Sequence, residues 1–212
     1  MVPPIPLGSL LRQRYLIQAI LGQGGFGRTY LAVDQERFDE RCVLKEFSVP
    51  YQDEELIKKS QILFQREAST LYQIQHPQIP RFWAAFEETQ RLFLVQDFVD
   101  GSTYRHLLNE RRQQGRVFSE DEVRFFLKNM LPVLAYIHDR GIVHRDISPE
   151  NIILRPASDP QKTQGQRSER GIPVLIDFGA VKEATTHWPL TSMVTRVGKV
   201  GYAPPEQLQT GQ

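Results

Sequence analysis

Two polar side chains of complementary chemistry lie five residues apart in the stretch 144–151, which reads His-Arg-Asp-Ile-Ser-Pro-Glu-Asn. The stretch directly follows an apolar pair, Ile142 and Val143. A carboxylate such as that of Asp146 can orient a hydroxyl nucleophile and accept its proton, while the amide oxygen of Asn151 can ligate Mg²⁺ beside it. The alternative is a plain turn closed by proline and asparagine, which needs no catalysis. The rest of the chain must decide between these two interpretations.

A glycine-rich segment near the N-terminus has the chemistry to hold phosphate groups. It runs Gly22-Gln23-Gly24-Gly25-Phe26-Gly27, a G-x-G-x-x-G spacing between the β-prone stretches 15–21 and 29–33. A strand after the glycines predicts a hairpin, whereas a dinucleotide fingerprint would continue into a helix. Glycines let backbone amides approach phosphate oxygens, and Phe26 at the tip would help to exclude water. Taken alone, the segment is equally compatible with ordinary turn chemistry.

One lysine on a predicted strand has a candidate partner on a predicted helix. Lys45 lies in the strand 41–47, where a lone lysine is usually a solvated edge residue. The following stretch 53–75 has the apolar spacing of a helix. Glu67, near its middle, is the expected partner. Glu54 and Glu55 are the fallback, but they lie in the first turn, where the helix dipole explains acidic residues.

Further along the chain, Asp177-Phe178-Gly179 follows an apolar strand, and Pro204-Pro205-Glu206 lies near the end. In this order the segments resemble the eukaryotic-type (Hanks-type) serine/threonine protein kinases, in their bacterial subgroup. The motifs that carry the resemblance are the glycine-rich loop, the V-A-I-K strand, the helix glutamate, H-R-D…N, D-F-G and A-P-E. It extends over most of the chain.

The resemblance implies an α+β, two-lobed protein-kinase-like fold with a small β-rich N-lobe and a mainly helical, incomplete C-lobe. The implied boundaries are a lead-in at 1–14, an N-lobe at 15–100 and a partial C-lobe at 101–212 that ends after the activation segment. A polar surface insertion at 155–171 has no assigned chemistry. The strand pattern predicts five strands in the N-lobe, the last two at 82–86 and 91–95.

Residue roles follow from the same resemblance. The catalytic residues it implies are Asp146, Lys45, Glu67, Ser148 and Lys199, and the metal ligands are Asn151 and Asp177. The residues implied to bind ATP are Gly22, Gln23, Gly24, Gly25, Phe26, Gly27, Thr29, Val43, Lys45, Asp97, Val99 and Ile153. Gln96 is the expected gatekeeper, and His144 and Phe178 are expected to stack towards Leu71. Arg145 is expected to bind a phosphate that raises activity. The candidate acceptors are Thr185, Thr186, Thr191, Ser192 and Thr195, of which Thr195 is favoured.

Two positions depart from the family pattern. Ser148 stands where the family usually has a lysine that contacts the γ-phosphate, and Lys199 stands where it usually has threonine. Our hypothesis is that the hydroxyl and the ammonium have exchanged positions, because loss of a cation at a dry phosphoryl-transfer site would cost several kcal/mol. Pro204 replaces the alanine of A-P-E. The C-lobe helices that normally follow are missing, so we expect an uncovered apolar surface.

A second helix is predicted to begin at Ser119, where a serine precedes Glu122 in the spacing of a capping box, and to reach about His138. Pro132 inside it is expected to kink it. Gly141 suits its termination.

Bulk composition limits the possible functions. The 212 residues are 40% hydrophobic with a net charge of +1 and mixed signs, which argues against a general nucleic-acid or anionic-membrane surface. The single cysteine, Cys42, excludes an internal disulfide and suggests a buried strand position. No signal peptide or apolar run of spanning length is apparent, so a cytoplasmic location is expected.

The predicted function is a serine/threonine protein kinase that uses ATP and Mg²⁺ and in which Asp146 orients a protein hydroxyl. Two alternatives stay open: a non-catalytic ATP-binding scaffold, and an inactive truncated fragment. Small-molecule kinases with this fold also remain possible. The expected partners are a protein substrate and, for the incomplete C-lobe, self-association or a covering partner.

Overall fold

The β-prone segments of the N-terminal half form one antiparallel sheet in the computed structural model, which describes residues 3–24, 27–47, 54–157, 171–178, 182–183 and 201–203. The chain divides into two compact units. Unit 1 comprises Met1–Gln75 and Pro80–Phe98, and unit 2 comprises His76–Ile79 and Val99–Gln212.

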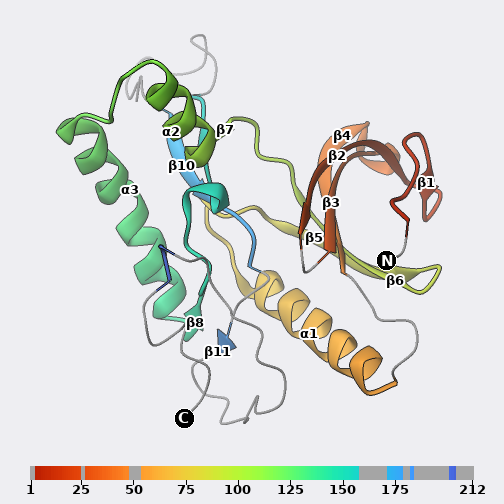
Figure 1. Cartoon of the computed structure of the whole chain (residues 1–212). Coiled ribbons are helices and arrows are strands. Elements are labelled where there is room, and N and C mark those ends of the chain that lie inside the picture. Colours follow the sequence, from red (N-terminus) through yellow and green to blue (C-terminus); the bar gives the residue numbers. More distant parts are fainter. Residues whose placement is uncertain are drawn as a thin grey trace. The chain divides into compact units, whose positions relative to one another are not determined.

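Unit 1 contains a curled six-stranded sheet in the order β1-β2-β3-β4-β6-β5 (Figure 1). The strands are β1 (Leu10–Leu11), β2 (Tyr15–Gly24), β3 (Gly27–Asp34), β4 (Glu40–Phe47), β5 (Phe82–Glu88) and β6 (Arg91–Asp97). Buried and partly buried residues alternate strictly along β3, as expected for a strand with one face on a core. The core side chains are Ile5, Leu11, Tyr15, Ile17, Tyr30, Ala32, Cys42, Leu44, Phe93 and Val95.

Pairs of left-handed residues close three of the hairpins. Both central residues of each turn have positive φ, which is the geometry whose twist matches that of the flanking strands. These pairs are Arg12 and Gln13, Phe38 and Asp39, and Thr89 and Gln90. A short 3-10 turn, η1 (Gln35–Arg37), precedes the second pair.

The prediction of five strands was wrong by one. Strand β1 lies inside the stretch expected to be a lead-in, and its residues pair with Leu16 and Tyr15 of β2. Ile5 and Leu11 are buried in the sheet core, so this stretch is an integral part of unit 1. The five predicted strands are all present.

Helix α1 (Glu54–Gln73) contacts β5 and β6 within unit 1. It buries Phe64 and Leu71, and the Phe64 ring meets Phe47 of β4 edge-on at 5.4 Å between centroids. Asp53, the predicted first residue of this helix, lies outside the described residues.

Unit 2 contains α2 (Tyr104–Gln113), α3 (Glu120–His138) and short strands. The predicted capping box is confirmed: Glu122 N–H donates to Ser119 Oγ, and Ser119 N–H donates to Glu122 Oε2. Helix α3 runs uninterrupted through Pro132 and ends at His138, as predicted. The remaining strands are β7 (Ser102–Thr103), β8 (Ile142–Val143), β9 (Ile152–Arg155), β10 (Ile172–Leu175) and β11 (Lys182–Glu183).

Strands β9 and β10 pair antiparallel, and β7 pairs with the other edge of β9. Strands β9 and β10 correspond to the two apolar runs predicted after residue 151. A segment from the first half of the chain also contributes here: Gln78 accepts a hydrogen bond from Leu175 N–H, and its side chain donates to the carbonyl oxygens of Asn129 and Pro173. Residues 76–79 therefore belong to unit 2 although unit 1 surrounds them in sequence.

Among the helices that the structure describes, none has the length and apolarity to cross a lipid bilayer. Cys42 is buried in the sheet as predicted, and burial raises the pKa of its thiol to about 12. A thiol that remains protonated is a poor nucleophile.

Candidate active site

The predicted ion pair of unit 1 is present. Lys45 on β4 and Glu67 on α1 approach to 2.9 Å between Nζ and Oε1, and both are mostly buried, with side chains 11% and 6% exposed. A carboxylate at this distance holds the ammonium in a defined position. The fallback Glu55 is exposed on the same helix.

The residues expected to line a nucleotide site in unit 1 share one face of the sheet. Thr29 lies directly opposite Lys45 in the β3–β4 register, and Val43 precedes Lys45 by two residues. Because side chains two apart on a strand point to the same face, Thr29, Val43 and Lys45 are neighbours. This face is only partly buried, which leaves room for a ligand.

The glycines of the hairpin differ in what the fold demands of them. Gly27 has φ of 143°, and a Cβ there would collide with the carbonyl oxygen of Glu46, so the sheet itself requires glycine. At Gly22 a Cβ would meet nothing within 4 Å. A glycine that packing does not require suits a position where a ligand must approach the backbone closely. Gln23 and Gly24 complete β2, whereas Gly25 and Phe26 lie outside the described residues.

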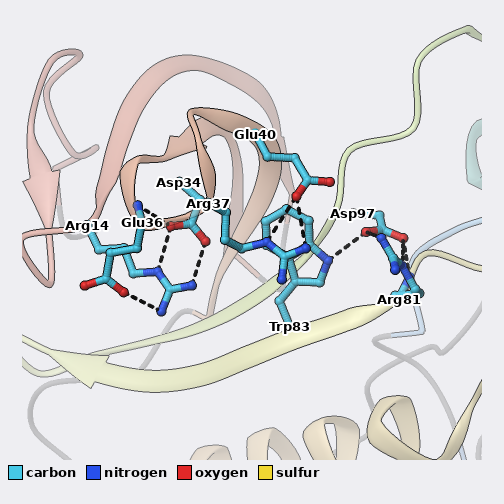
Figure 2. A network of polar contacts seen from close by, with 8 residues as sticks. All are labelled: Arg14, Asp34, Glu36, Arg37, Glu40, Arg81, Trp83 and Asp97. Carbon is cyan, nitrogen blue, oxygen red and sulfur yellow. Dashed lines mark hydrogen bonds and ion pairs between the residues drawn. The ribbon is translucent and has the colours of Figure 1, made fainter.

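The expected hinge begins with a tightly held aspartate at the end of β6. Asp97 accepts hydrogen bonds from Arg81 Nε at 2.9 Å and from Trp83 Nε1 at 2.7 Å (Figure 2). Burial alone would raise the pKa of Asp97, but hydrogen bonds from Arg81 and Trp83 lower it overall. Its N–H donates to the Arg81 carbonyl oxygen at 3.0 Å. The sequence did not indicate that Arg81 and Trp83 would bind the Asp97 side chain.

The gatekeeper candidate Gln96 directly precedes Asp97. It is buried, and within the described part of the chain its Nε2 has no hydrogen-bond partner. Val99, the last hinge candidate, is buried in unit 2.

The stretch 144–151 is internally braced in unit 2. Asn151 Nδ2 donates to both the carbonyl oxygen and Oδ2 of Asp146, each at 2.8 Å. The fully buried His144 accepts from Asp146 N–H through Nδ1, so its Nε2 donates to the Ile176 carbonyl oxygen at 3.1 Å. The backbone next to Asp177 is thereby tied to the backbone of Asp146.

Two non-glycine residues in this region adopt left-handed backbone conformations outside any hairpin. Arg145 has φ of 66° and Asp177 has φ of 61°. Such strained residues concentrate at functional sites. The rings of His144 and Phe178 meet edge-on with centroids 4.8 Å apart, whereas their expected packing towards Leu71 stays a prediction.

Ser148 is 1% exposed, and within the described part of the chain its Oγ has no hydrogen-bond partner. It helps to line an apolar cavity of about 310 Å³ in unit 2. The other residues that line it include Tyr104, Leu108, Phe118, Phe126, Ile147 and Tyr202. The β9 residue Ile153, expected at adenine, lies in the same unit and pairs with Val174.

An arginine bridge that the sequence did not indicate contacts this loop. Arg105 on α2 donates to Glu150 Oε1 at 2.7 Å and to the Tyr202 hydroxyl at 3.0 Å. Glu150 lies directly before Asn151, in the 3-10 turn η2 (Pro149–Asn151). The sequence pattern of α2 could have indicated that Arg105 lies on a helix. It does not indicate which residues Arg105 binds.

Several predicted residues lie outside the described ranges. These are Gly179, Lys199, Thr195 and Pro204-Pro205-Glu206, together with most of the insertion 155–171. The structure brings together Lys45, Glu67, Thr29 and Val43 in unit 1, and separately His144, Asp146, Asn151 and Phe178 in unit 2.

The donor chemistry fits a magnesium ion shared with phosphate. Asn151 uses its amide nitrogen on Asp146, so its oxygen is the atom left to face a cation, and Asp177 adds an exposed carboxylate. Mg²⁺ prefers oxygen ligands and is usually held by one or two protein groups together with substrate phosphates. The described residues contain no cluster of three His, Cys, Asp or Glu side chains that could hold a metal by themselves.

Structural comparison identifies the fold. A crystal structure of a kinase domain superposes with a TM-score of 0.69 at 21% identity, covering 87% of this chain and 56% of that chain, which shows the fold alone. The apo form of PpkA-294 gives a TM-score of 0.66 at 26% identity, covering 83% and 62%. The expected two-part α+β kinase fold is therefore confirmed.

Sequence comparison extends the likeness. Serine/threonine-protein kinase-like protein E of Synechocystis sp. is 42% identical over 84% of this chain, and serine/threonine-protein kinase PknA of Nostoc sp. is 40% identical over 94%. The chain spans only 26% and 34% of the lengths of these two relatives. A family model described as the protein kinase domain matches residues 15–212. The chain therefore belongs to the protein kinase family, and the resemblance read from its motifs is confirmed.

Proposed function

We propose that this chain transfers the γ-phosphoryl group of ATP to serine or threonine hydroxyls of a protein substrate. The relatives at 40–42% identity are named a serine/threonine-protein kinase and a serine/threonine-protein kinase-like protein, which supports the acceptor class.

In unit 1, the ammonium of Lys45 binds the α- and β-phosphates, and Glu67 holds it in place. Glycine backbone at residues 22–27 covers the phosphates, while Thr29 and Val43 contact adenine from the same face of the sheet. The Asp97 carbonyl and the Val99 backbone hold the adenine edge.

In unit 2, Asp146 orients the acceptor hydroxyl and accepts its proton. Asn151 fixes that carboxylate and offers its own oxygen to the metal, with Asp177 as the second ligand. A bound Mg²⁺ would neutralise charge on the phosphates. Ile153 completes the adenine contact from this unit.

The observation that carries the proposal is the double hydrogen bond from Asn151 to Asp146 at 2.8 Å. An amide that donates hydrogen bonds to both the backbone and the side chain of one aspartate fixes the carboxylate in a single orientation. A plain turn closed by proline and asparagine needs no hydrogen bond to a carboxylate. The geometry therefore favours the catalytic interpretation of 144–151 over the turn.

The test is phosphotransfer from labelled ATP with Mg²⁺ to a generic protein acceptor, comparing wild type with Asp146→Asn. Asparagine keeps the size and the contact to Asn151 but cannot accept a proton, so incorporation should fall at least about a hundredfold. Equal incorporation by the two proteins would contradict the proposal.

A non-catalytic ATP-binding scaffold is the second candidate, and one observation favours it. Ser148 occupies the position of the usual lysine, is buried and carries no charge. A direct ATP titration beside the phosphotransfer assay separates the candidates, since a scaffold binds ATP without turnover.

An uncovered apolar surface of unit 2 supports a further part of the proposal. Val123, Leu127 and Leu131 lie one turn apart on α3 and are 46%, 44% and 57% exposed. Together with the cavity beside Ser148, they form the kind of surface that soluble domains usually cover. We include a covering segment, a partner or self-association in the proposal. A cytoplasmic location also belongs to it, since a single buried thiol suits a reducing compartment.

A further inference from the structure

A buried glutamate directly after Lys45 has no role in the chemistry described above. Glu46 is on β4, and its side chain points to the sheet face opposite that of Lys45 because adjacent strand residues alternate. Its side chain is 5% exposed. A buried carboxylate is costly unless it is paired, so its partners indicate what it does.

Three side chains from two other strands converge on this carboxylate. The Tyr30 hydroxyl donates to Oε2 at 2.7 Å, Arg91 Nη1 donates to Oε1 at 3.0 Å, and Arg28 Nη1 lies 3.6 Å from Oε2. Arg28 and Arg91 are 9% and 14% exposed, so both guanidinium groups are largely withdrawn from water. We call Glu46, Arg28, Tyr30 and Arg91 the Glu46 cluster.

The cluster is connected to the glycine-rich hairpin through Arg28. Arg28 lies directly opposite Glu46 in the β3–β4 register and directly opposite Gln23 in the β2–β3 register. Its Nε donates to Gln23 Oε1 at 3.3 Å, so one guanidinium bridges both arms of the hairpin and strand β4. Charge-assisted contacts of this kind restrict the motion of the groups that they join.

The geometry points to Glu46 as a positioning residue for the glycine-rich hairpin, acting through Arg28 from the face of β4 opposite Lys45. The inference rests on the proposed function, because the hairpin positioned in this way is the one assigned to the phosphates of ATP. Glu46 touches no substrate itself. The same strand thus fixes the lysine on one face and the hairpin on the other.

The test uses the full chain and three variants. Glu46→Gln keeps the volume and the acceptor for Tyr30 but removes the charge that faces both arginines. Arg28→Met removes the contacts of Arg28 with Gln23 and with Glu46, while Glu46 keeps its contacts with Tyr30 and Arg91. The matched control is Asp34→Asn, which removes the charge of a buried aspartate that pairs with Arg14 at 2.7 Å (Figure 2). Asp34 is the last residue of β3, at the end away from the glycines.

Two readouts are measured for each variant: the dissociation constant of MgATP by calorimetry, and amide hydrogen exchange of residues 22–24 and 27–29. Glu46→Gln and Arg28→Met should each weaken MgATP binding about tenfold, which corresponds to ~1.4 kcal/mol, and should speed exchange in the hairpin. Asp34→Asn should lower the melting temperature while leaving both readouts at the wild-type values.

The outcomes separate the inference from the function on which it rests. Unchanged hairpin exchange in Glu46→Gln and Arg28→Met would overturn the inference whatever the nucleotide does. Equal weakening of MgATP binding by Asp34→Asn would also overturn it, since a general loss of stability would then explain the effect. Faster hairpin exchange in a chain that binds no MgATP would support the positioning role and refute the proposed function.

Discussion

The Lys45–Glu67 pair predicts a strong energetic coupling between β4 and α1. Two unit charges 2.9 Å apart attract by about 6 kcal/mol at an effective dielectric constant of ~20. Desolvation of both groups offsets part of this attraction, and loss of one partner of a buried pair typically costs about 3–5 kcal/mol. We therefore expect Glu67→Gln and Lys45→Met each to lower the free energy of unfolding by about 3 kcal/mol.

The assay is a double-mutant cycle followed by urea unfolding, with the exposed Glu55→Gln as a control on the same helix. The double variant should cost about 2–3 kcal/mol less than the sum of the single variants, because the second change removes a charge that is already unpaired. Phosphotransfer by both single variants should fall together. Additive stability losses would refute the reasoning, since the two charges would then not stabilise one another.

Three further predictions concern unit 2. The hydrogen bond from Arg111 lowers the pKa of Glu122 from 4.5 to about 2, so its contribution to stability is present above pH ~4.5 and is lost as the pH falls towards 2. The difference in unfolding free energy between wild type and Glu122→Gln should therefore shrink over that interval, and a constant difference would contradict it. Ser148→Lys and Lys199→Thr should each reduce phosphotransfer, and the double variant should restore it. Additive losses would contradict the hypothesis that the hydroxyl and the ammonium have exchanged positions. Because Ser148 is 1% exposed, circular dichroism must first show that Ser148→Lys is folded. Thr195→Ala should lower the activity of the phosphorylated chain to that of the unphosphorylated one, and unchanged activity would remove Thr195 as the regulatory site.

Features encoded by short-range patterns were predictable from the sequence. The capping box at Ser119 and Glu122 depends on residues three apart, and both of its hydrogen bonds are present. The Lys45–Glu67 contact spans 22 residues but was predictable because each residue sits in a recognisable family motif. Such motifs convey which residues meet even when local propensity does not.

Features that depend on distant pairing were missed. Strand β1 is two residues long, too short for any alternation to appear, and only its partners in β2 reveal it. Asp97 gave no sign that its side chain would bind Arg81 and Trp83, since the three are brought together by the β5–β6 pairing. The Arg105–Glu150 bridge joins residues 45 apart across a helix and a turn, and no local pattern encodes such a contact.

Residues 76–79 also affect the order in which the chain can fold during synthesis. Unit 1 is fully synthesised once Phe98 has been added, yet the segment it encloses must wait for its partners in unit 2, one of which, Pro173, lies 95 residues after Gln78. At about 5–20 residues per second, that interval lasts roughly 5–20 s on the ribosome. We therefore expect the sheet of unit 1 to fold first around a solvated gap between α1 and β5. Gln78 would then act as the template on which the late strand β10 docks.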